Sequence, residues 1–362
     1  MERNEPTLVD AAALEAFVRD IFTVAGCDAD EAGRIAEHLV RANLTGHDSH
    51  GVVRVPRYVE WLEAGYVLKG QTAEVVTDGD SFVVLDGKFG FGQTVAPQAV
   101  ALGIERASVK GLCVAALRNA GHIGRVGAYA EQAMAAGLIS IHFVNVAGSV
   151  LVAPFGGVER RFSTAPFTIG VPLPGRPLVL DFATSRVAEG KVQVASTGGK
   201  PLPADALIEP DGRLSGDPRT LYGSYEPVGP RDPTRGSGAI RAFGEHKGSG
   251  LALMCEMLGG ALTAGGTAGP VTERARIANG MLSIFLSPKH FGTQAEFQRM
   301  GIAYAEWVSS CRPADPGAPV LLPGEPEAAT RAARLKGGVP LPQDAWSNIC
   351  ATAHRLNVSL PG

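Results

Sequence analysis

The hydrophobic and polar positions of the first 65 residues predict three helices. Apolar residues recur at helical spacing over residues 8–25 and again over residues 28–44. Asp28 and Glu31 form a capping-box-like start for the second helix. Residues 56–65 predict a third helix, because Pro56 stands at its start and Gly65 at its end. These helices flank residues 41–57, RANLTGHDSHGVVRVPR.

Farther along, apolar runs that suit strands alternate with helical patterns, which is typical of an α/β fold. Strand, glycine-rich turn and helix are predicted over residues 81–107, and strand, loop, helix and strand over residues 111–148. The remaining elements are a strand at LVLDFATS, an apolar helix within residues 244–265, a strand over 279–288, a helix over 295–310 and a helix from about residue 327. Residues 200–242 lack apolar periodicity and predict a loop that serves as a lid or an intersubunit arm.

Bulk properties narrow the class of protein. The 33 Lys and Arg residues balance 36 Asp and Glu residues, which argues against a nucleic-acid or anionic-membrane partner. The five cysteines stand far apart without a CxxC pair, which favours reduced thiols in the cytosol. No apolar signal core follows the amino terminus. Polar residues interrupt the apolar runs at 137–157 and 248–266, so both predict buried core, and we expect a cytoplasmic protein.

Residues 41–57 carry the densest candidate chemistry. His50 can exchange a proton near neutral pH, and Ser49 beside it can donate or accept a hydrogen bond. If the chain turns helical after Gly51, Arg54 shares a face with His50 and can clamp a carboxylate in bidentate fashion. That trio suits a 2-oxo or 2-hydroxy acid. Two alternatives stay open: Asp48 and Ser49 as helix caps, or His47 and His50 as metal ligands, for which no third ligand is recognisable.

Other candidates follow strands or begin helices. His122 lies in the loop after a predicted strand, before a helix expected near Gly124, where open α/β sheets place ligands; hydrogen bonding within the loop is the alternative. Asp181 ends an apolar run, with Thr184 and Ser185 behind it, and suits either a ligand contact or a helix cap. Lys247 at a helix start suits an anion such as a cofactor, or simple exposure.

The turn at Gly90 and Gly92 does not complete a Rossmann fingerprint. Val95 replaces the third glycine, and no strand ending in Asp or Glu follows at the required distance. The turn is interpreted as a strand-to-helix connection, with phosphate binding at the helix start as an alternative.

Several motifs together resemble the malate/L-lactate dehydrogenase family of the second type, the L-sulfolactate dehydrogenase-like group, and are most similar to its bacterial hydroxycarboxylate dehydrogenases. The motifs are HDSHG with RVPRY, RNAGHIGRVGAYAEQA, APFGG, LDFATSRVAEGKV, HKGSGLALMCEML and PGEPE, and they span nearly the whole chain. Two departures stand out. Ala120 and Gly121 replace the Ser or Asn common before the second histidine, and Ala165 replaces the asparagine of a TNP motif.

The resemblance implies an α/β, non-Rossmann fold of the L-sulfolactate dehydrogenase type. It comprises a helical N-terminal segment, residues 1–78, which carries HDSHG and packs with the C-terminal part. A core over residues 79–320 holds a central mixed sheet flanked by helices, and residues 321–362 form a helical C-terminal segment. Members are NAD(P)-dependent oxidoreductases of 2-hydroxy acids, some of which reduce cyclic imines or diketo acids. They are usually homodimers with sites near the subunit contact.

By the same resemblance, His50 and His122 serve catalysis and contact the cofactor, while Ser49 and Arg54 contact a small 2-hydroxy or 2-oxo acid. The other expected cofactor contacts are Gly124, Arg125, Asp181, Phe182, Ala183, Thr184, Ser185, Lys247, Pro323, Gly324 and Glu325. We expect hydride transfer between C2 of the acid and NAD, with NADP left open and no bound metal. A cyclic imino acid or diketo acid reductase is the first alternative. A metal-dependent hydrolase and a binding protein without turnover are remote ones.

Overall fold

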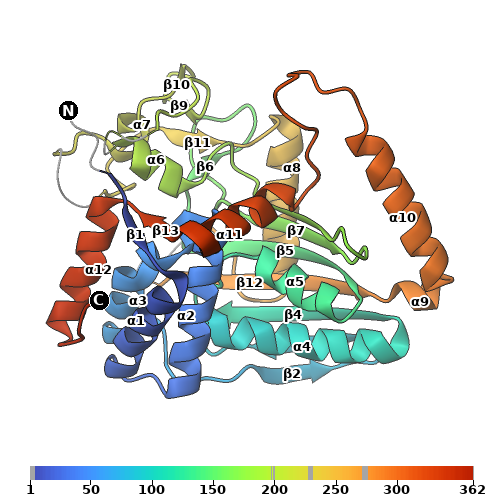
Figure 1. Ribbon diagram of the computed structural model, residues 1–362. Coiled ribbons are helices and arrows are strands. Elements are labelled where there is room, and N and C mark those ends of the chain that lie inside the picture. Colours follow the sequence, from blue (N-terminus) through green and yellow to red (C-terminus); the bar gives the residue numbers. More distant parts are fainter. Residues whose placement is uncertain (1–4, 197, 199, 227–230, 271–275, 362) are drawn as a thin grey trace.

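A seven-stranded sheet forms the centre of the molecule (Figure 1). The structure is a computed structural model that describes residues 5–196, 198, 200–226, 231–270 and 276–361. In spatial order the strands are β2 (Glu74–Asp78), β3 (Phe82–Asp86), β4 (Leu112–Ala120), β12 (Ala278–Leu286), β5 (Ile139–Ala147), β7 (Pro166–Val171) and β8 (Leu178–Ala183). β3 and β4 pair in parallel and the other neighbours pair antiparallel, so the predicted mixed sheet is confirmed.

The predicted crossover over residues 111–148 is present. β4 and β5 are both antiparallel to β12 and therefore parallel to each other, with α5 (Gly127–Ala135) connecting them. α5 begins at Gly127 and not near Gly124 as predicted. It covers one face of the sheet together with α4 (Gly92–Lys110), whose hydrophobic cluster includes Val144. Phe143 points to the opposite face and packs under α8 (His246–Cys255).

The two ends of the chain share one hydrophobic core. α1 (Ala11–Val24), α2 (Ala29–Leu44) and α3 (Val55–Glu63) pack with residues of α12 (Gln343–Arg355), such as Ile349. Next to them β1 (Thr7–Val9) pairs antiparallel with β13 (Val339–Leu341). The contacts of α11 (Glu325–Gly337) with α2 place the start of α11 beside the HDSHG stretch.

The predicted loop over residues 200–242 contains four short elements that were not predicted. This region contains β9 (Leu207–Ile208), β10 (Leu214–Ser215), α7 (Arg219–Tyr222) and β11 (Ala239–Arg241). With β6 (Val152–Ala153) the three strands form a small second sheet, and α6 (Glu189–Ser196) packs on it through Val192. The strands are too short to leave a period in the sequence, so the prediction missed them.

The apolar run over residues 248–266 is only partly buried, contrary to the prediction. α8, the following π-helical segment Glu256–Ala261 and the residue after it leave four large side chains exposed: Leu253, Met254, Met257 and Leu262. After α9 (Pro288–Phe291), α10 (Gln294–Ser309) extends along the side of the molecule (Figure 1). Among the described residues, no helix has the length and apolar character needed to cross a membrane.

Candidate active site

The HDSHG stretch folds into two short 3-10 turns, Asp48–His50 and Val52–Arg54, which lead into α3. Gly51 between them is extended, so His50 and Arg54 do not share one helix face as the spacing argument assumed. Asn43 fixes the bend, because its side-chain oxygen accepts from the amide of Val52 at 2.8 Å and its nitrogen donates to Asp48 at 2.6 Å. This anchor was missed in the sequence, where Asn43 looks like an ordinary helical position.

His50 and His122 come together from distant parts of the chain. Their ring centroids lie 5.6 Å apart and the rings are nearly parallel, at 12°. The Ser49 hydroxyl lies 3.0 Å from Nδ1 of His50. Arg54 donates from Nε to the backbone oxygen of Ser49 at 2.6 Å. The structure therefore gathers all four residues for which a catalytic role was predicted.

Tyr58 and Gln93 complete the surroundings of His122. The Tyr58 hydroxyl lies 2.5 Å from Nδ1 of His122, and Gln93 donates to that hydroxyl at 3.2 Å and to the backbone oxygen of His122 at 3.0 Å. The phenol accepts from Gln93 and can donate its own proton to Nδ1; in that arrangement the hydrogen of His122 stands on Nε2. Neither residue was predicted. Tyr58 lies within the predicted helix over residues 56–65, where a tyrosine reads as a core position.

Burial keeps both imidazoles neutral at pH 7. Both residues are partly exposed as a whole, but burial of the imidazole lowers the pKa of His50 to about 3, and the Arg54 charge adds to the effect. The same two causes lower the pKa of His122 well below its usual value. Burial also raises the pKa of the Tyr58 hydroxyl, so it keeps its proton.

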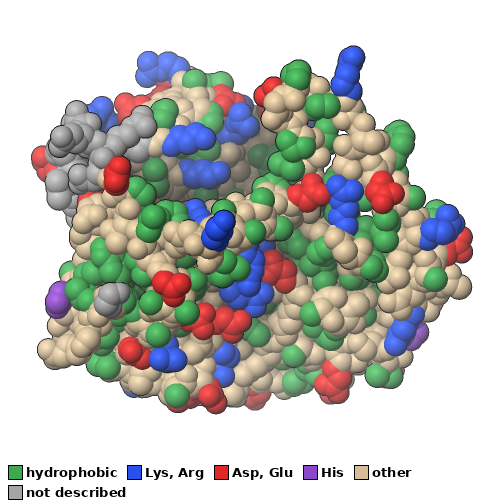
Figure 2. Space-filling view, viewed as in Figure 1, with side chains coloured by type: hydrophobic (Ala, Val, Ile, Leu, Met, Phe, Trp, Pro, Cys, Tyr) green, Lys and Arg blue, Asp and Glu red, His purple; other side chains and the backbone are tan. Residues whose placement is uncertain are grey.

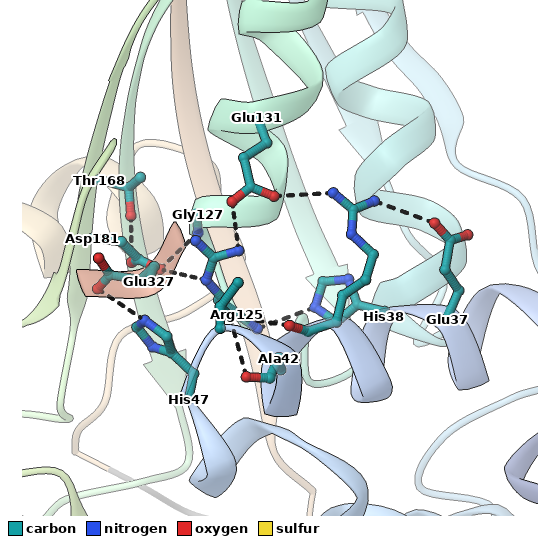
Figure 3. A network of polar contacts seen from close by, with 12 residues as sticks. Glu37, His38, Ala42, His47, Arg125, Gly127, Glu131, Thr168, Asp181 and Glu327 are labelled. Atoms are coloured by element: carbon teal, nitrogen blue, oxygen red, sulfur yellow. Dashed lines mark hydrogen bonds and ion pairs between the residues drawn. The ribbon is translucent and has the colours of Figure 1, made fainter. Parts of the chain in front are cut away.

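A charged network supports the loop after His122 (Figure 3). The Arg125 side chain is only 1% exposed, donates to Glu131 at 2.7 Å and lies 3.7 Å from Asp181. Asp181 accepts from the amide of Gly127 at 2.8 Å and from the Thr168 hydroxyl at 2.7 Å. Asp181 therefore caps α5 from a neighbouring strand. The helix-cap alternative for Asp181 therefore holds, but the capped helix lies 54 residues earlier in the chain, so sequence spacing could not indicate it.

The remaining predicted cofactor segments gather along β8. The backbone oxygen of Pro323 accepts from Val179 at 3.1 Å, and Gly324 adopts a left-handed conformation (φ 95°) as α11 begins. At the other end of β8, the Phe182 ring lies 5.1 Å from the Phe243 ring. Thr184 and Ser185 follow β8 and pair with the segment before α8.

Lys247 is exposed in the first turn of α8, close to that segment. Glu325, by contrast, uses its carboxylate within the protein, where it binds Arg176 and the amide of Leu322. No contact in the described residues joins Lys247 to either active-site histidine.

His47 and His50, the two ligands of the metal alternative, point to different partners. His47 pairs with Glu327 at 3.5 Å, while His50 faces Ser49 and His122. Across the described part of the chain, no group of three or more His, Cys, Asp or Glu side chains is arranged to hold an ion.

Comparison with known proteins agrees with this architecture. The family model described as malate/L-lactate dehydrogenase matches residues 9–350. Hydroxycarboxylate dehydrogenase B of Escherichia coli K12 is 41% identical over 96% of this chain and 94% of its own. A Δ1-pyrroline-2-carboxylate/Δ1-piperideine-2-carboxylate reductase of Pseudomonas syringae pv. tomato is 34% identical over 72% of this chain and 70% of its own.

Among solved structures, sulfolactate dehydrogenase from Methanocaldococcus jannaschii superposes with a TM-score of 0.84 at 29% identity. The alignment covers 98% of each chain, so the predicted fold class is confirmed. The family model covers nearly the whole chain and the relatives align along most of their length. The chain therefore belongs to the malate/L-lactate dehydrogenase family.

Proposed function

We propose that the protein is a dehydrogenase that transfers a hydride between a nicotinamide cofactor and C2 of a small 2-hydroxy or 2-oxo acid. The observation that carries the proposal is the pair of neutral, stacked imidazoles beside Arg54. A guanidinium can grip the acid's carboxylate, and an imidazole N–H can serve the oxygen on C2. Family membership supports the same reaction class.

His122 is the proton-transfer residue in this proposal. Its neutral Nε2–H donates a hydrogen bond to the oxygen on C2, which gains negative charge as the carbonyl is reduced. As the alcohol forms, the Nε2 proton moves to that oxygen, the Tyr58 proton moves to Nδ1, and solvent returns a proton to Tyr58, so the imidazole stays neutral. The Tyr58 hydroxyl at Nδ1 fixes this tautomer. His50 stacks against His122 and, held by Ser49, orients the substrate and shields it from water. Arg54 binds the substrate carboxylate and so places C2 of the substrate beside the imidazoles of His50 and His122.

The residues present fit a nicotinamide cofactor, which would supply or accept the hydride. The exposed Lys247 stands at the start of a ten-residue helix, where helix amides and a cation together suit a diphosphate. The backbone of residues 182–185 and 323–325 lies along the same strand. Arg125 and Asp181 are engaged with each other and with α5, so they support these segments rather than bind the cofactor with their side chains. NAD is the expected form, with NADP also to be tested.

The test replaces each histidine by asparagine and follows the reduced cofactor at about 340 nm with a panel of 2-oxo acids. We expect His122→Asn to lower kcat by about 100- to 10,000-fold, the usual contribution of acid–base help, with the fold retained. His354→Asn, on the exposed face of α12, is the control and leaves kcat unchanged. Full activity in both the His50 and the His122 variants would overturn the assignment.

A cyclic imino acid reductase is the second candidate, favoured by the Pseudomonas syringae relative. The same arginine and histidine would then serve a C=N bond in a ring that carries a carboxylate. A competition between pyruvate and a cyclic imine, each with NADH and NADPH, decides between them. A higher kcat/KM for the imine would favour the second candidate.

The protein assembles as a homodimer in this proposal. α10 buries only Ala305, and it exposes Met300, Tyr304 and Trp307 at helical spacing along one face. Hydrophobic side chains are visible over α10 in Figure 2. An exposed stripe of this kind marks a protein contact. Sedimentation should give a dimer for the wild-type chain and a monomer for Trp307→Glu, whereas a wild-type monomer at micromolar concentration would contradict it.

A further inference from the structure

A carboxylate stands close to the active site and has no part in the chemistry above. It belongs to Glu189, the first residue of α6. The next residue, Gly190, lies so close to the HDSHG stretch that a Cβ built on it would stand 2.7 Å from Cβ of Ser49. The start of α6 therefore forms a wall of the space that holds Ser49 and His50.

Tyr222 holds Glu189 in this wall. The Tyr222 side chain is buried, and its hydroxyl donates to Oε1 of Glu189 at 2.5 Å. Burial and the Glu189 charge raise the pKa of that hydroxyl, while the positive charges of Arg231 and, to a smaller extent, Arg54 act on it in the opposite direction. The Glu189–Tyr222 pair thus lies within the electrostatic reach of the proposed carboxylate clamp.

A second cation close to this wall is already engaged. Arg231 donates from Nε to the Ser196 hydroxyl at 2.8 Å, and its guanidinium lies 4.2 Å from the centroid of the Tyr225 ring. A substrate that places one carboxylate on Arg54 would present the group on C3 to the α6 wall, which carries the Glu189 carboxylate.

We infer that Glu189, anchored by Tyr222, makes the enzyme discriminate against 2-oxo and 2-hydroxy acids that carry a second anionic group. The inference rests on the proposed function and names its substrate class: monoanionic acids with an uncharged, preferably hydroxyl-bearing side chain. A second carboxylate would face a like charge in a partly desolvated site, which is costly. A hydroxyl on C3 can instead donate to the free Oε2 side of the carboxylate.

The experiment compares kcat/KM for hydroxypyruvate, pyruvate and oxaloacetate in the wild type, Glu189→Gln and Glu189→Arg. The wild type should prefer hydroxypyruvate over oxaloacetate by at least about tenfold. Glu189→Gln should lower the ratio of kcat/KM for hydroxypyruvate to kcat/KM for oxaloacetate by about tenfold. Glu189→Arg should make oxaloacetate the better substrate. Tyr222→Phe, which frees the carboxylate without removing its charge, should narrow the ratio less than Glu189→Gln does.

Glu105→Gln is the matched control. It removes one exposed carboxylate from α4, about 20 Å along the helix from the end beside His122, and should leave every ratio unchanged. The inference is overturned, while the dehydrogenase activity stands, if Glu189→Arg leaves the hydroxypyruvate-to-oxaloacetate ratio of kcat/KM unchanged. It is also overturned if Arg231→Gln changes that ratio instead. If the wild type reduces no 2-oxo acid, the proposed function fails and this inference fails with it.

Discussion

At the scale of single residues, hydrogen-bond partners determine how the two histidines of the candidate site can act. The sequence identified His50, His122, Ser49 and Arg54 because their side chains carry recognisable chemistry. It did not identify Tyr58, since a tyrosine in an amphipathic helix reads as core. Its hydroxyl reaches His122 only because α3 packs beside the loop after β4, and that tertiary contact leaves no local sequence signal.

Tyr58→Phe tests the tautomer argument. The change removes the hydroxyl at Nδ1 of His122 and leaves the ring in place, so Nδ1 can take the proton and Nε2 can lose it. We expect kcat to fall by about 10- to 100-fold with KM within about twofold, because the loss affects proton transfer and not substrate binding. Steady-state kinetics over pH 6 to 9 measure both parameters.

Tyr129→Phe provides the comparison for this variant. Tyr129 is as deeply buried as Tyr58, but its hydroxyl donates to the backbone oxygen of Ile123 at 2.6 Å. Its loss should lower stability with a much smaller effect on kcat. Equal losses of kcat in the two variants would indicate a general packing effect and not a positioning role for Tyr58.

At the scale of elements, periodicity predicted the long segments and missed the short ones. α1, α2 and the central strands carry the apolar patterns from which they were predicted. The two-residue strands of the second sheet and the break at Gly51 depend on contacts from far along the chain, such as the side chain of Asn43. For the same reason the contact between Gly190 and Ser49 could not be predicted.

Two glycines, Gly324 just before α11 and Gly337 at its end, allow a matched test of the turn at residues 323–325. Gly324 has φ of 95°, and a Cβ there would stand 3.1 Å from the amide nitrogen of Val179. Gly324→Ala should therefore lower the free energy of unfolding by about 1–2 kcal/mol. It should also raise KM for the cofactor if this turn contacts it as proposed. Urea unfolding and cofactor titrations measure the two effects.

Gly337, the last residue of α11, is the partner of that test. A Cβ there would meet no atom within 4 Å, and its φ lies outside the left-handed region. Gly337→Ala should be neutral or stabilising by up to about 1 kcal/mol, because alanine restricts the unfolded chain. Equal destabilisation at both positions would show that the backbone conformation of Gly324 is not the cause.

At the scale of the whole molecule, four histidines with lowered pKa values link stability to pH. Burial lowers the pKa to about 3 in three of them and well below the usual value in the fourth: His38, His50, His142 and His122. His142 is the clearest case, since it is fully buried in the sheet and bonded to Ser283 at 2.8 Å and Ser140 at 3.0 Å. The unfolded chain binds protons at these sites near pH 6.5, and the folded chain does not.

Because the unfolded state binds more protons than the folded state below pH 6.5, stability should fall as the pH drops through the window from about 6.5 toward 3. Each fully buried histidine contributes a slope of at most about 1.4 kcal/mol per pH unit, and the partly open rings contribute less. Between pH 7.5 and 5.5 we expect a total loss of about 2–4 kcal/mol in urea unfolding. His142→Asn should reduce that slope by about one proton, whereas His354→Gln, an exposed site, should not change it. A free energy of unfolding that stays constant from pH 7.5 to 5.5 would show that these histidines are protonated in the folded protein, and the neutral imidazole pair would lose its basis.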